Sequence, residues 1–384
     1  MGFFEKNATI EHMNIAIHSA DLSDNRVDGT RVYLLHMLKQ FGLIEKGDTF
    51  FLYHAKKFNK ELKPPVLDNY HPQKTRPMPL WTQISFAHKL WTDNPEVLWM
   101  PLANIPLVRK KNLKTVVTIH DLAFNHFPEY FTRKDLFKLK ALAFTSIHLA
   151  DKIIAVSQST KNDIVRFYPT VSPEKIKVIH HGFDGELFNK TGLKESEGRL
   201  LWEKYSLEKG KYILYVGAIQ PRKNLKTLVD AFELIARRYF DMKLVIAGEK
   251  AWMWQETIRH IKKSEFRERI ILTGPVPFVD LSIFYRAASV FSFPSLYEGF
   301  GIPVLEAFAS GVPVVAAQNS SLLEIGEGAA LFHKTHSAED LAEKLDMVLD
   351  DEKKRAVMVK LGRKKCKEFS WKKCAKETLG YIKE

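Results

Sequence analysis

The feature of this chain that most constrains its fold is a repeated alternation of short, β-rich runs with longer helical patterns. Such alternation is typical of parallel sheets whose strands are connected by crossover helices. In the first half, strands are expected at residues 13–20, 49–55, 97–102, 114–120, 152–157 and 176–182, and helices at 30–42, 134–148 and 158–167. A polar stretch at residues 188–209 then interrupts the pattern.

After that stretch the same alternation starts again. Strands are expected at residues 211–218, 243–249, 269–274, 289–295 and 312–317, and helices at 225–239, 255–265, 280–287, 304–310 and 338–349. Because the pattern restarts near residue 185 of 384, we predict an α/β fold with two doubly wound, Rossmann-like domains, the first at residues 1–184. Ligands of such sheets bind beyond the carboxyl ends of the strands, so we expect the active site in a cleft between the domains.

Composition and cysteine usage are those of an ordinary globular protein. The chain is 45% hydrophobic and 27% charged, and it has no apolar run of the about 20 residues that a membrane helix needs. Its polar start (residues 1–12) does not resemble a secretory signal. Cys366 and Cys374 are expected in one helix, about 12 Å apart along its axis, which is too far for a disulfide. We therefore expect free thiols and a cytoplasmic location.

The net charge of +13 is unusual and is distributed over both halves of the chain. Basic clusters at residues 108–114 and 353–376 are each consistent with a solvated surface, with an acidic substrate, or with peripheral contact to an anionic membrane at its inner face. A nucleic-acid partner is not expected, because no aromatic-basic RNA-binding motif is present. Neither an Asp-x-Asp pair nor a Cys/His cluster is present, so no metal or other cofactor is expected.

The segment GAIQPRKNLKTL (217–228) follows the first strand of the second half and opens a helix. Gly217 permits a tight turn, and Asn224 is expected to cap the helix, whose N-terminal amides attract anions. Arg222 and Lys223 beside that end are suited to bind a diphosphate, although a surface Arg-Lys pair would give the same pattern. The segment lacks the G-x4-G-K-[ST] sequence of P-loop NTPases, which excludes that class.

The segment SLYEGFGIPVLEAF (295–308) places a carboxylate on each side of a glycine-rich turn. Gly299 and Gly301 permit close approach of the backbone to a ligand. The helix that follows is expected to start at Pro303, which puts Glu306 in its first turn and leaves Glu298 in the loop. Ionised carboxylates here would accept hydrogen bonds from sugar or ribose hydroxyls. Stabilisation of the helix dipole would explain Glu306 alone, and not Glu298 or the glycines.

The first half contributes fewer candidate residues. The segment TIHDLAF (118–124) puts His120 at the carboxyl end of a strand, where it would face the cleft. Gly29, at the start of a helix, offers an amide to a phosphate. His180 and His181, near the domain junction, are expected to pack in the hinge. The tryptophans at positions 81, 91 and 99 are expected in the core.

Taken together, these motifs resemble retaining glycosyltransferases of family 4, whose GT-B fold has two Rossmann-like domains facing across a cleft. The segments that carry the resemblance are PSLYEGFGIPVLEAFASGVPVV (294–315), GAIQPRKNL (217–225), TIHDLAF (118–124), ADKIIAVSQSTKNDI (150–164) and FSWKKCAKETL (369–379). They are most similar to the mannosyltransferase-type branch, which implies GDP-mannose as the donor. The chain departs from the family at Asp28, where paired glycines are usual, and at His181, where Asn is usual.

The resemblance also implies a role for each domain of the chain. Residues 1–184 would bind the acceptor, residues 185–364 would bind the nucleotide-sugar donor, and residues 365–384 would form a helix that crosses back to the N-terminal domain. In the donor domain, the stretch at residues 274–279 would hold the base.

Roles for individual residues follow from the matching positions. Arg222 and Lys223 would neutralise the donor diphosphate, and Glu306 would bind the ribose. Glu298 and His120 would contact the transferred sugar. The catalytic candidates are therefore His120, Arg222, Lys223 and Glu298, and the wider donor-binding set adds Gly29, Gly217, Gly248, Val276, Gly299, Phe300, Gly301, Ile302 and Glu306.

Two other functions use the same motifs and stay open at this point. One is a UDP-sugar transferase of the same fold, specific for glucose or N-acetylglucosamine, and the other is a non-catalytic protein that binds sugar nucleotides. The acceptor, a glycan or a lipid-linked sugar, and the linkage formed are not fixed by the sequence.

Overall fold

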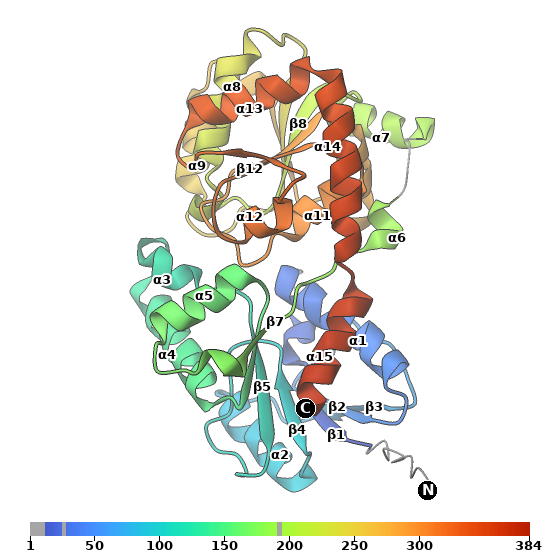
Figure 1. Cartoon of the computed structure of the whole chain (residues 1–384), viewed down its shortest axis with the longest axis vertical. Helices are drawn as coiled ribbons and strands as arrows, with labels where there is room; N and C mark the ends of the chain where they lie inside the picture. The colour runs from blue at the N-terminus through green and yellow to red at the C-terminus, as the bar shows by residue number, and fades with distance from the viewer. Residues whose placement is uncertain (1–11, 25–27, 190–193) are drawn as a thin grey trace, which may run out of the picture.

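The computed structural model describes residues 12–24, 28–189 and 194–384, which form two α/β units stacked along the long axis of the molecule (Figure 1). The polar start of the chain, which sequence analysis set apart from secretory signals, lies outside the described residues. Each unit is built on one parallel sheet covered by helices. The predicted α/β class with two doubly wound sheets is confirmed.

The first sheet has the strand order β3-β2-β1-β4-β5-β6-β7, with every pair parallel. Its strands are β1 Asn14–His18, β2 Thr49–His54, β3 Tyr70–Lys74, β4 Val97–Met100, β5 Lys114–Ile119, β6 Lys152–Ala155 and β7 Ile176–Val178. Its helices are α1 Gly29–Ile44, α2 Ala87–Asp93, α3 Ala123–His126, α4 Arg133–Leu149 and α5 Gln158–Phe167, with a π-helical turn η2 at Thr82–Phe86. The continuous apolar run of β4 is buried throughout, as expected for a parallel strand covered on both faces.

The second sheet has the order β10-β9-β8-β11-β12-β13 and is also parallel. Its strands are β8 Tyr212–Val216, β9 Lys243–Ala247, β10 Ile270–Gly274, β11 Val290–Phe293, β12 Val314–Ala317 and β13 Leu331–His333. The 3-10 turn η5 at Pro221–Lys223 follows β8, and the helices are α6 Gly185–Phe188, α7 Glu195–Tyr205, α8 Leu225–Ala236, α9 Gln255–Lys263, α10 Phe278–Ala287, α11 Ile302–Ala309, α12 Ser320–Gly326, α13 Ala338–Asp350 and α14 Glu352–Lys365.

The helices form where the sequence supplies one apolar face. In α8 the buried side chains of Leu225, Leu228, Val229, Phe232 and Ile235 recur at the spacing of a single helical face. At the start of α5, the Ser157 hydroxyl accepts a hydrogen bond from the Thr160 amide and so caps the helix. Sequence patterning therefore fixes the local elements on both sides of the cleft.

Three sequence-based expectations about the elements were wrong. The edge strand β3 was missed because its sequence, YHPQK, is polar and contains Pro72, which an edge strand tolerates. The short edge strand β13 was also missed. Cys366 and Cys374 do not share a helix, because the 3-10 turn η7 (Cys366–Glu368) ends α14 before α15 (Trp371–Lys383) begins, and both thiols are free and buried.

The last helix returns to the first unit. Figure 1 shows α14 against the second unit and α15 beside α1 of the first. Side chains of α15, including Trp371 and Leu379, belong to the same buried cluster as Ile15 and Trp99. The returning chain passes very close to the connection between the units, since a Cβ on Gly182 would overlap the backbone nitrogen of Trp371. The carboxyl ends of both sheets consequently face one another across a tightly packed junction.

Candidate active site

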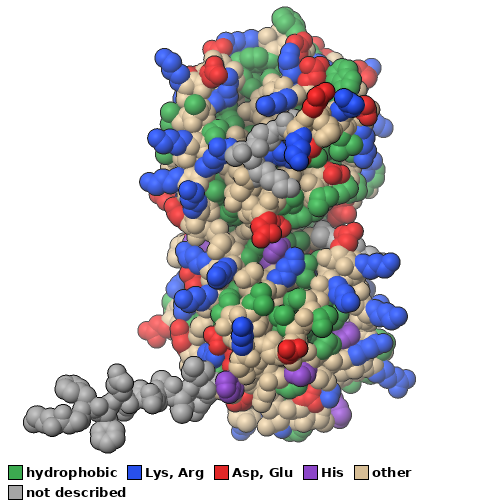
Figure 2. Space-filling view, turned by 90° about the vertical axis from the view of Figure 1, so that its right-hand side faces the viewer, with side chains coloured by type: hydrophobic (Ala, Val, Ile, Leu, Met, Phe, Trp, Pro, Cys, Tyr) green, Lys and Arg blue, Asp and Glu red, His purple; other side chains and the backbone are tan. Residues whose placement is uncertain are grey.

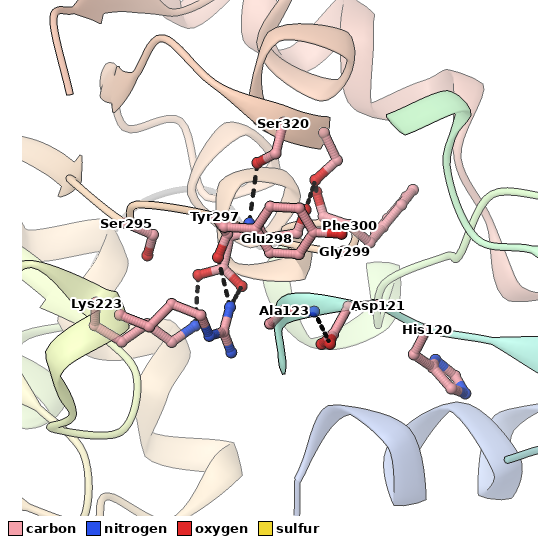
Figure 3. A network of polar contacts seen from close by, with 12 residues as sticks. His120, Asp121, Ala123, Lys223, Ser295, Tyr297, Glu298, Gly299, Phe300 and Ser320 are labelled. Atoms are coloured by element: carbon pink, nitrogen blue, oxygen red, sulfur yellow. Dashed lines mark hydrogen bonds and ion pairs between the residues drawn. The ribbon is translucent and has the colours of Figure 1, made fainter. Parts of the chain in front are cut away.

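The site is formed where the loop after β11 meets the loop after β5 (Figure 3). The Tyr297 hydroxyl accepts a hydrogen bond from the backbone amide of Leu122 at 3.5 Å, and the Thr160 hydroxyl donates to the Gly299 carbonyl at 3.3 Å. Gly299 lies directly against the carbonyl oxygen of His120, where a Cβ would overlap that oxygen. Predicted site residues from both halves of the chain thus converge at one point.

A buried cluster of two cations and one carboxylate occupies the C-terminal side. The Lys223 ammonium lies 2.5 Å from one oxygen of Glu298, and the Arg222 guanidinium lies 3.3 Å from the other. Burial opposes ionisation of Glu298, but the charges of Lys223 and Arg222 outweigh it and lower its pKa. The carboxylate is therefore ionised at neutral pH, and the cluster carries one surplus positive charge.

The turn that carries these cations is bonded to the glycine-rich loop. Asn224 adopts a left-handed backbone conformation, with φ of 54°, and its side-chain amide donates to the carbonyls of Pro294 and Thr335. The backbone amide of Leu296 donates to the Arg222 carbonyl at 2.8 Å. Asn224 occupies the N-cap position of α8 as predicted, but its side-chain oxygen accepts from the Thr227 hydroxyl rather than from a helix amide. Its effect is to fix the orientation of Arg222 and Lys223.

Two polar atoms in this turn are buried without a hydrogen-bond partner. They are the Nε of Arg222 and the side-chain oxygen of Gln220. Buried polar groups are nearly always paired in folded proteins, so unpaired ones beside a cationic cluster indicate a position where a ligand would complete the bonding. The cluster is thus suited to an anionic ligand such as a diphosphate.

The glycine-rich loop is held from above by the start of α12. The Ser320 hydroxyl accepts from the Glu298 amide at 3.0 Å, and the Ser321 hydroxyl donates to the carbonyls of Glu298 and Phe300. Gly301 has φ of 110°, which favours glycine, and precedes Ile302, the first residue of α11. The two serines were missed as site residues, because nothing in the local sequence links them to a loop about 20 residues away.

Glu306 lies one residue further into α11 than the sequence suggested. The helix starts at Ile302 rather than at Pro303, so Glu306 falls outside the first turn and the alternative of a helix-dipole partner is not supported. The side chain is buried and accepts a hydrogen bond from the Tyr285 hydroxyl at 2.9 Å. Burial raises the pKa of Glu306 to about 7. This carboxyl group therefore differs from Glu298, which has two cations beside it.

On the N-terminal side, His120 is held through both ring nitrogens. Its Nε2 lies 2.9 Å from the carbonyl of Pro101, and its Nδ1 lies 3.2 Å from Nε2 of His181. Burial lowers the pKa of His120, so the ring is neutral at physiological pH. The ring is not charged, in contrast to the opposite side of the site.

The remaining predicted donor residues are arranged around this centre. Gly217 and Gly248 directly follow β8 and β9 and contact each other, since a Cβ on Gly248 would overlap the Gly217 carbonyl. Val276 packs against the core of the second unit. Gly29 is the first residue of α1, and a Cβ added there would meet no atom within 4 Å. The N-cap is Asp28, whose carboxylate accepts from the Arg31 amide, so an acid occupies the helix end where a phosphate was expected.

Two general features of the described residues bear on the class of protein. In the part of the chain that the structure describes, no helix is long and apolar enough to cross a membrane. Within the same residues, no group of three or more His, Cys, Asp or Glu side chains could hold a metal ion.

Comparison with protein families assigns a class to both halves. Residues 29–187 match the family described as Glycosyltransferase Family 4, and residues 200–365 match the family described as Glycosyl transferases group 1. Together the two matches span most of the chain. The chain therefore belongs to the family 4 type of glycosyltransferases, and the predicted enzyme class is confirmed.

Named relatives and solved structures agree with this assignment. The O-antigen chain mannosyltransferase B of Escherichia coli is 29% identical over 278 residues, 70% of each chain. The serotype-specific mannosyltransferase WbdA of Escherichia coli is 29% identical over 66% of this chain but only 30% of its own length. The structure of Anabaena HepE in complex with UDP and glucose has a TM-score of 0.75 at 18% identity, covering 97% of this chain and 100% of that one. The structure of the lipopolysaccharide glycosyltransferase WaaG has a TM-score of 0.71 at 13% identity, covering 96% and 99%. The GT-B fold is confirmed.

Proposed function

We propose that this glycosyltransferase transfers mannose from GDP-mannose, with retention of anomeric configuration, to a glycan or a lipid-linked acceptor. The observation that carries the proposal is the buried cluster of Arg222, Lys223 and Glu298 facing the His120 carbonyl across Gly299. The cations would bind the diphosphate, and Glu298 and the amides of the glycine-rich loop would bind the sugar. No metal or cofactor is part of this proposal.

The chemistry follows from where charge develops. When the bond between the anomeric carbon and the diphosphate oxygen breaks, negative charge grows on the departing nucleoside diphosphate. Lys223 and Arg222 are already fixed in place by Glu298, so they would stabilise that charge without reorganising. In the proposed front-face reaction, the departing phosphate oxygen takes the proton from the acceptor hydroxyl as that hydroxyl forms the new glycosidic bond.

The identity of the sugar is supported by the names of relatives. Several matched proteins are named mannosyltransferases, including RfbU of Salmonella typhimurium at 28% identity over 59% of this chain. A second candidate, transfer from a UDP-sugar, is favoured by the likeness of fold to HepE, which was solved with UDP-glucose. A third, a non-catalytic sugar-nucleotide-binding protein, would retain donor binding without turnover.

Thermal stabilisation by a panel of nucleotides separates these candidates. Wild-type protein would be heated with GDP, UDP, ADP and their common sugars, and release of free nucleotide from the stabilising sugar would then be followed. We expect stabilisation by GDP and GDP-mannose, with slow release of GDP that an acceptor accelerates. Stabilisation by UDP-sugars alone would overturn the donor, and binding without any turnover would favour the non-catalytic alternative.

We also propose a cytoplasmic protein whose N-terminal domain makes peripheral contact with an anionic membrane. Residues 69–92 and 97–120 contain seven lysines and arginines and no acidic residue. The same two segments expose large apolar side chains, namely Met78, Leu80, Ile84, Trp91, Leu107 and Val108. Gln83 joins the segments by bonding to the backbone of Ile105 and Leu107. Trp91, expected in the core, is half exposed here.

Exposed apolar side chains beside an excess of cations suit the interface of an anionic lipid bilayer, although Lys89 pairs with Asp93. Sedimentation with phosphatidylglycerol vesicles at low salt would test this. We expect binding that weakens when Lys110 and Lys111 are both changed to Ser, and that persists when Lys353 and Lys360 of the other basic cluster are changed. No sedimentation of the wild type would refute the membrane proposal and leave the donor proposal untouched.

A further inference from the structure

His181 lies at the meeting point of four parts of the molecule. It follows β7 in the connection between the two units and is 3% exposed. Its ring lies 4.5 Å from Tyr33 of α1, 5.2 Å from His120, 5.0 Å from Phe300 of the glycine-rich loop and 5.7 Å from Trp371 of α15. Packing in the hinge, as sequence analysis expected, accounts for these contacts but not for the choice of a histidine.

The hydrogen bonds of the two rings determine which nitrogens carry protons. A carbonyl oxygen only accepts, so Nε2 of His120 must donate its proton to Pro101. In a neutral ring the other nitrogen is then an acceptor, so Nδ1 of His120 accepts from its neighbour, Nε2 of His181. By the same logic His181 is protonated at Nε2 and bare at Nδ1. Burial, with the neighbouring histidines, holds the pKa of His181 well below its usual value, in keeping with a neutral ring.

The second ring nitrogen of His181, Nδ1, shows that packing alone does not explain a histidine at this position. Its Nδ1 is buried and has no hydrogen-bond partner. Burying an unpaired polar atom costs free energy, which an apolar side chain of similar shape would avoid. A histidine at this position is therefore explained by its single useful bond, the one from Nε2 to His120.

We propose that His181 is a positioning residue that fixes the ring orientation of His120 by donating its Nε2 proton to His120 Nδ1, while the Pro101 carbonyl keeps the His120 proton on Nε2. The backbone carbonyl of the same residue lies against Gly299 at the domain contact. The inference deepens the proposed function, since it rests on His120 facing the transferred sugar.

Glutamine and asparagine place a donor nitrogen at the positions of the two ring nitrogens of histidine, so they serve as matched variants of His181. The amide nitrogen of a glutamine is as many bonds from the backbone as Nε2 of histidine, whereas the amide nitrogen of an asparagine corresponds to Nδ1. His181→Gln should therefore keep the donor to His120, and His181→Asn should place its donor where no acceptor lies. His181→Leu removes the donor and keeps much of the packing.

The experiment combines a spectroscopic and a kinetic readout on the full chain. Nitrogen NMR of protein labelled with 15N-histidine, assigned with a His120→Gln variant, reports through the Nδ1 shift of His120 whether that nitrogen accepts a hydrogen bond. We expect a hydrogen-bonded Nδ1 in the wild type and in His181→Gln. In His181→Leu and His181→Asn we expect the shift of an unbonded Nδ1, with the proton still on Nε2, kcat for GDP-mannose lowered about 10-fold, the effect of losing one hydrogen bond, and GDP affinity unchanged.

Two outcomes would overturn the proposal. One is an unchanged His120 Nδ1 shift and kcat in folded His181→Leu, even if its melting temperature falls, because that would make His181 a packing residue only. The other is loss of the Nδ1 hydrogen bond in His181→Gln as well as in His181→Asn. Failure of the proposed function would look different, since the wild type would then show the hydrogen-bonded Nδ1 but no turnover of any nucleotide sugar.

Discussion

The C-terminal side of the site presents fixed charges, whereas the N-terminal side presents a neutral ring and a backbone carbonyl. Arg222 and Lys223 are held by an ionised Glu298, while His120 is held by neutral hydrogen bonds to Pro101 and His181. A departing diphosphate needs preorganised positive charge, and a cation on the sugar side would oppose charge that develops at the anomeric carbon. In the proposed reaction, the charged side would serve the departing diphosphate and the neutral side the transferred sugar.

The largest expected effect comes from removing one cation of the charged side. Lys223→Met should lower kcat/KM for the donor by about 10²- to 10³-fold, because a group that stabilises the leaving diphosphate is lost. Steady-state release of nucleotide measures this. Lys226→Met is the matched control, since that lysine lies one turn away on the surface and pairs only with Glu256 in the described contacts. Equal losses in both variants would contradict a specific role for Lys223.

The two glutamates of the charged side should respond differently to pH. Glu306 has no cation beside it, and burial raises its pKa to about 7. Below about pH 4.5 the group is protonated in both folded and unfolded chains. Above that pH the unfolded chain ionises while the folded one retains its proton. The wild type should therefore lose up to about 3 kcal/mol of stability relative to Glu306→Gln between pH 4.5 and 7, and the difference should level off above pH 7.

Urea unfolding of wild type and Glu306→Gln at several pH values measures this difference. A wild type that gains stability relative to Glu306→Gln as the pH rises from 4.5 to 7, or no pH dependence at all, would mean that Glu306 is not a neutral buried acid. The same variant should also weaken nucleotide binding if the carboxyl group accepts from the ribose.

Adding one methyl group at Gly299 should disturb the contact between the glycine-rich loop and the His120 carbonyl. Gly299→Ala places a Cβ onto the His120 carbonyl oxygen, so the loop must move and kcat should fall by about 10- to 100-fold. Nucleotide affinity should change little, because Lys223 and Arg222 are untouched. Gly380→Ala in α15 is the control, since a Cβ there meets no atom within 4 Å. Wild-type kcat in Gly299→Ala would refute the importance of this contact.

A smaller effect is expected at the edge of the same contact. The Tyr297 hydroxyl donates to the Asp163 carboxylate at 2.6 Å, joining the glycine-rich loop to α5. Tyr297→Phe should lower the free energy of unfolding by about 1–2 kcal/mol without changing nucleotide affinity, as measured by urea unfolding and by titration. A loss of nucleotide affinity with normal stability would place Tyr297 in the donor site instead.

The sequence predicted the architecture and the charged side of the site better than the neutral side. Strand and helix periodicity located both doubly wound sheets, because each buried strand is a continuous apolar run. Arg222 and Lys223 were singled out because they lie beside a predicted helix start, and Glu298 because it precedes the glycine-rich turn. Their pairing with each other was not foreseen, since Lys223 and Glu298 are 75 residues apart.

Other features could not be read from local sequence. Ser320, Ser321 and Asn224 act through bonds to loops distant in the chain. The bond between His120 and His181 depends on how the connection between the units packs against α15, and no periodicity reports that packing. Polar contacts of long sequence separation are therefore where sequence-based expectations were silent or wrong.

The central claim is that the charged side recognises a diphosphate, and a titration comparing GDP with GMP tests it most directly. Both nucleotides would be titrated calorimetrically into wild type and into Lys223→Met. We expect the wild type to bind GDP at least about 10-fold more tightly than GMP, a preference of about 1.4 kcal/mol for the second phosphate, and Lys223→Met to lose most of that preference. An equal preference for GDP in both proteins, or no preference in the wild type, would contradict the assignment of the diphosphate to Arg222 and Lys223.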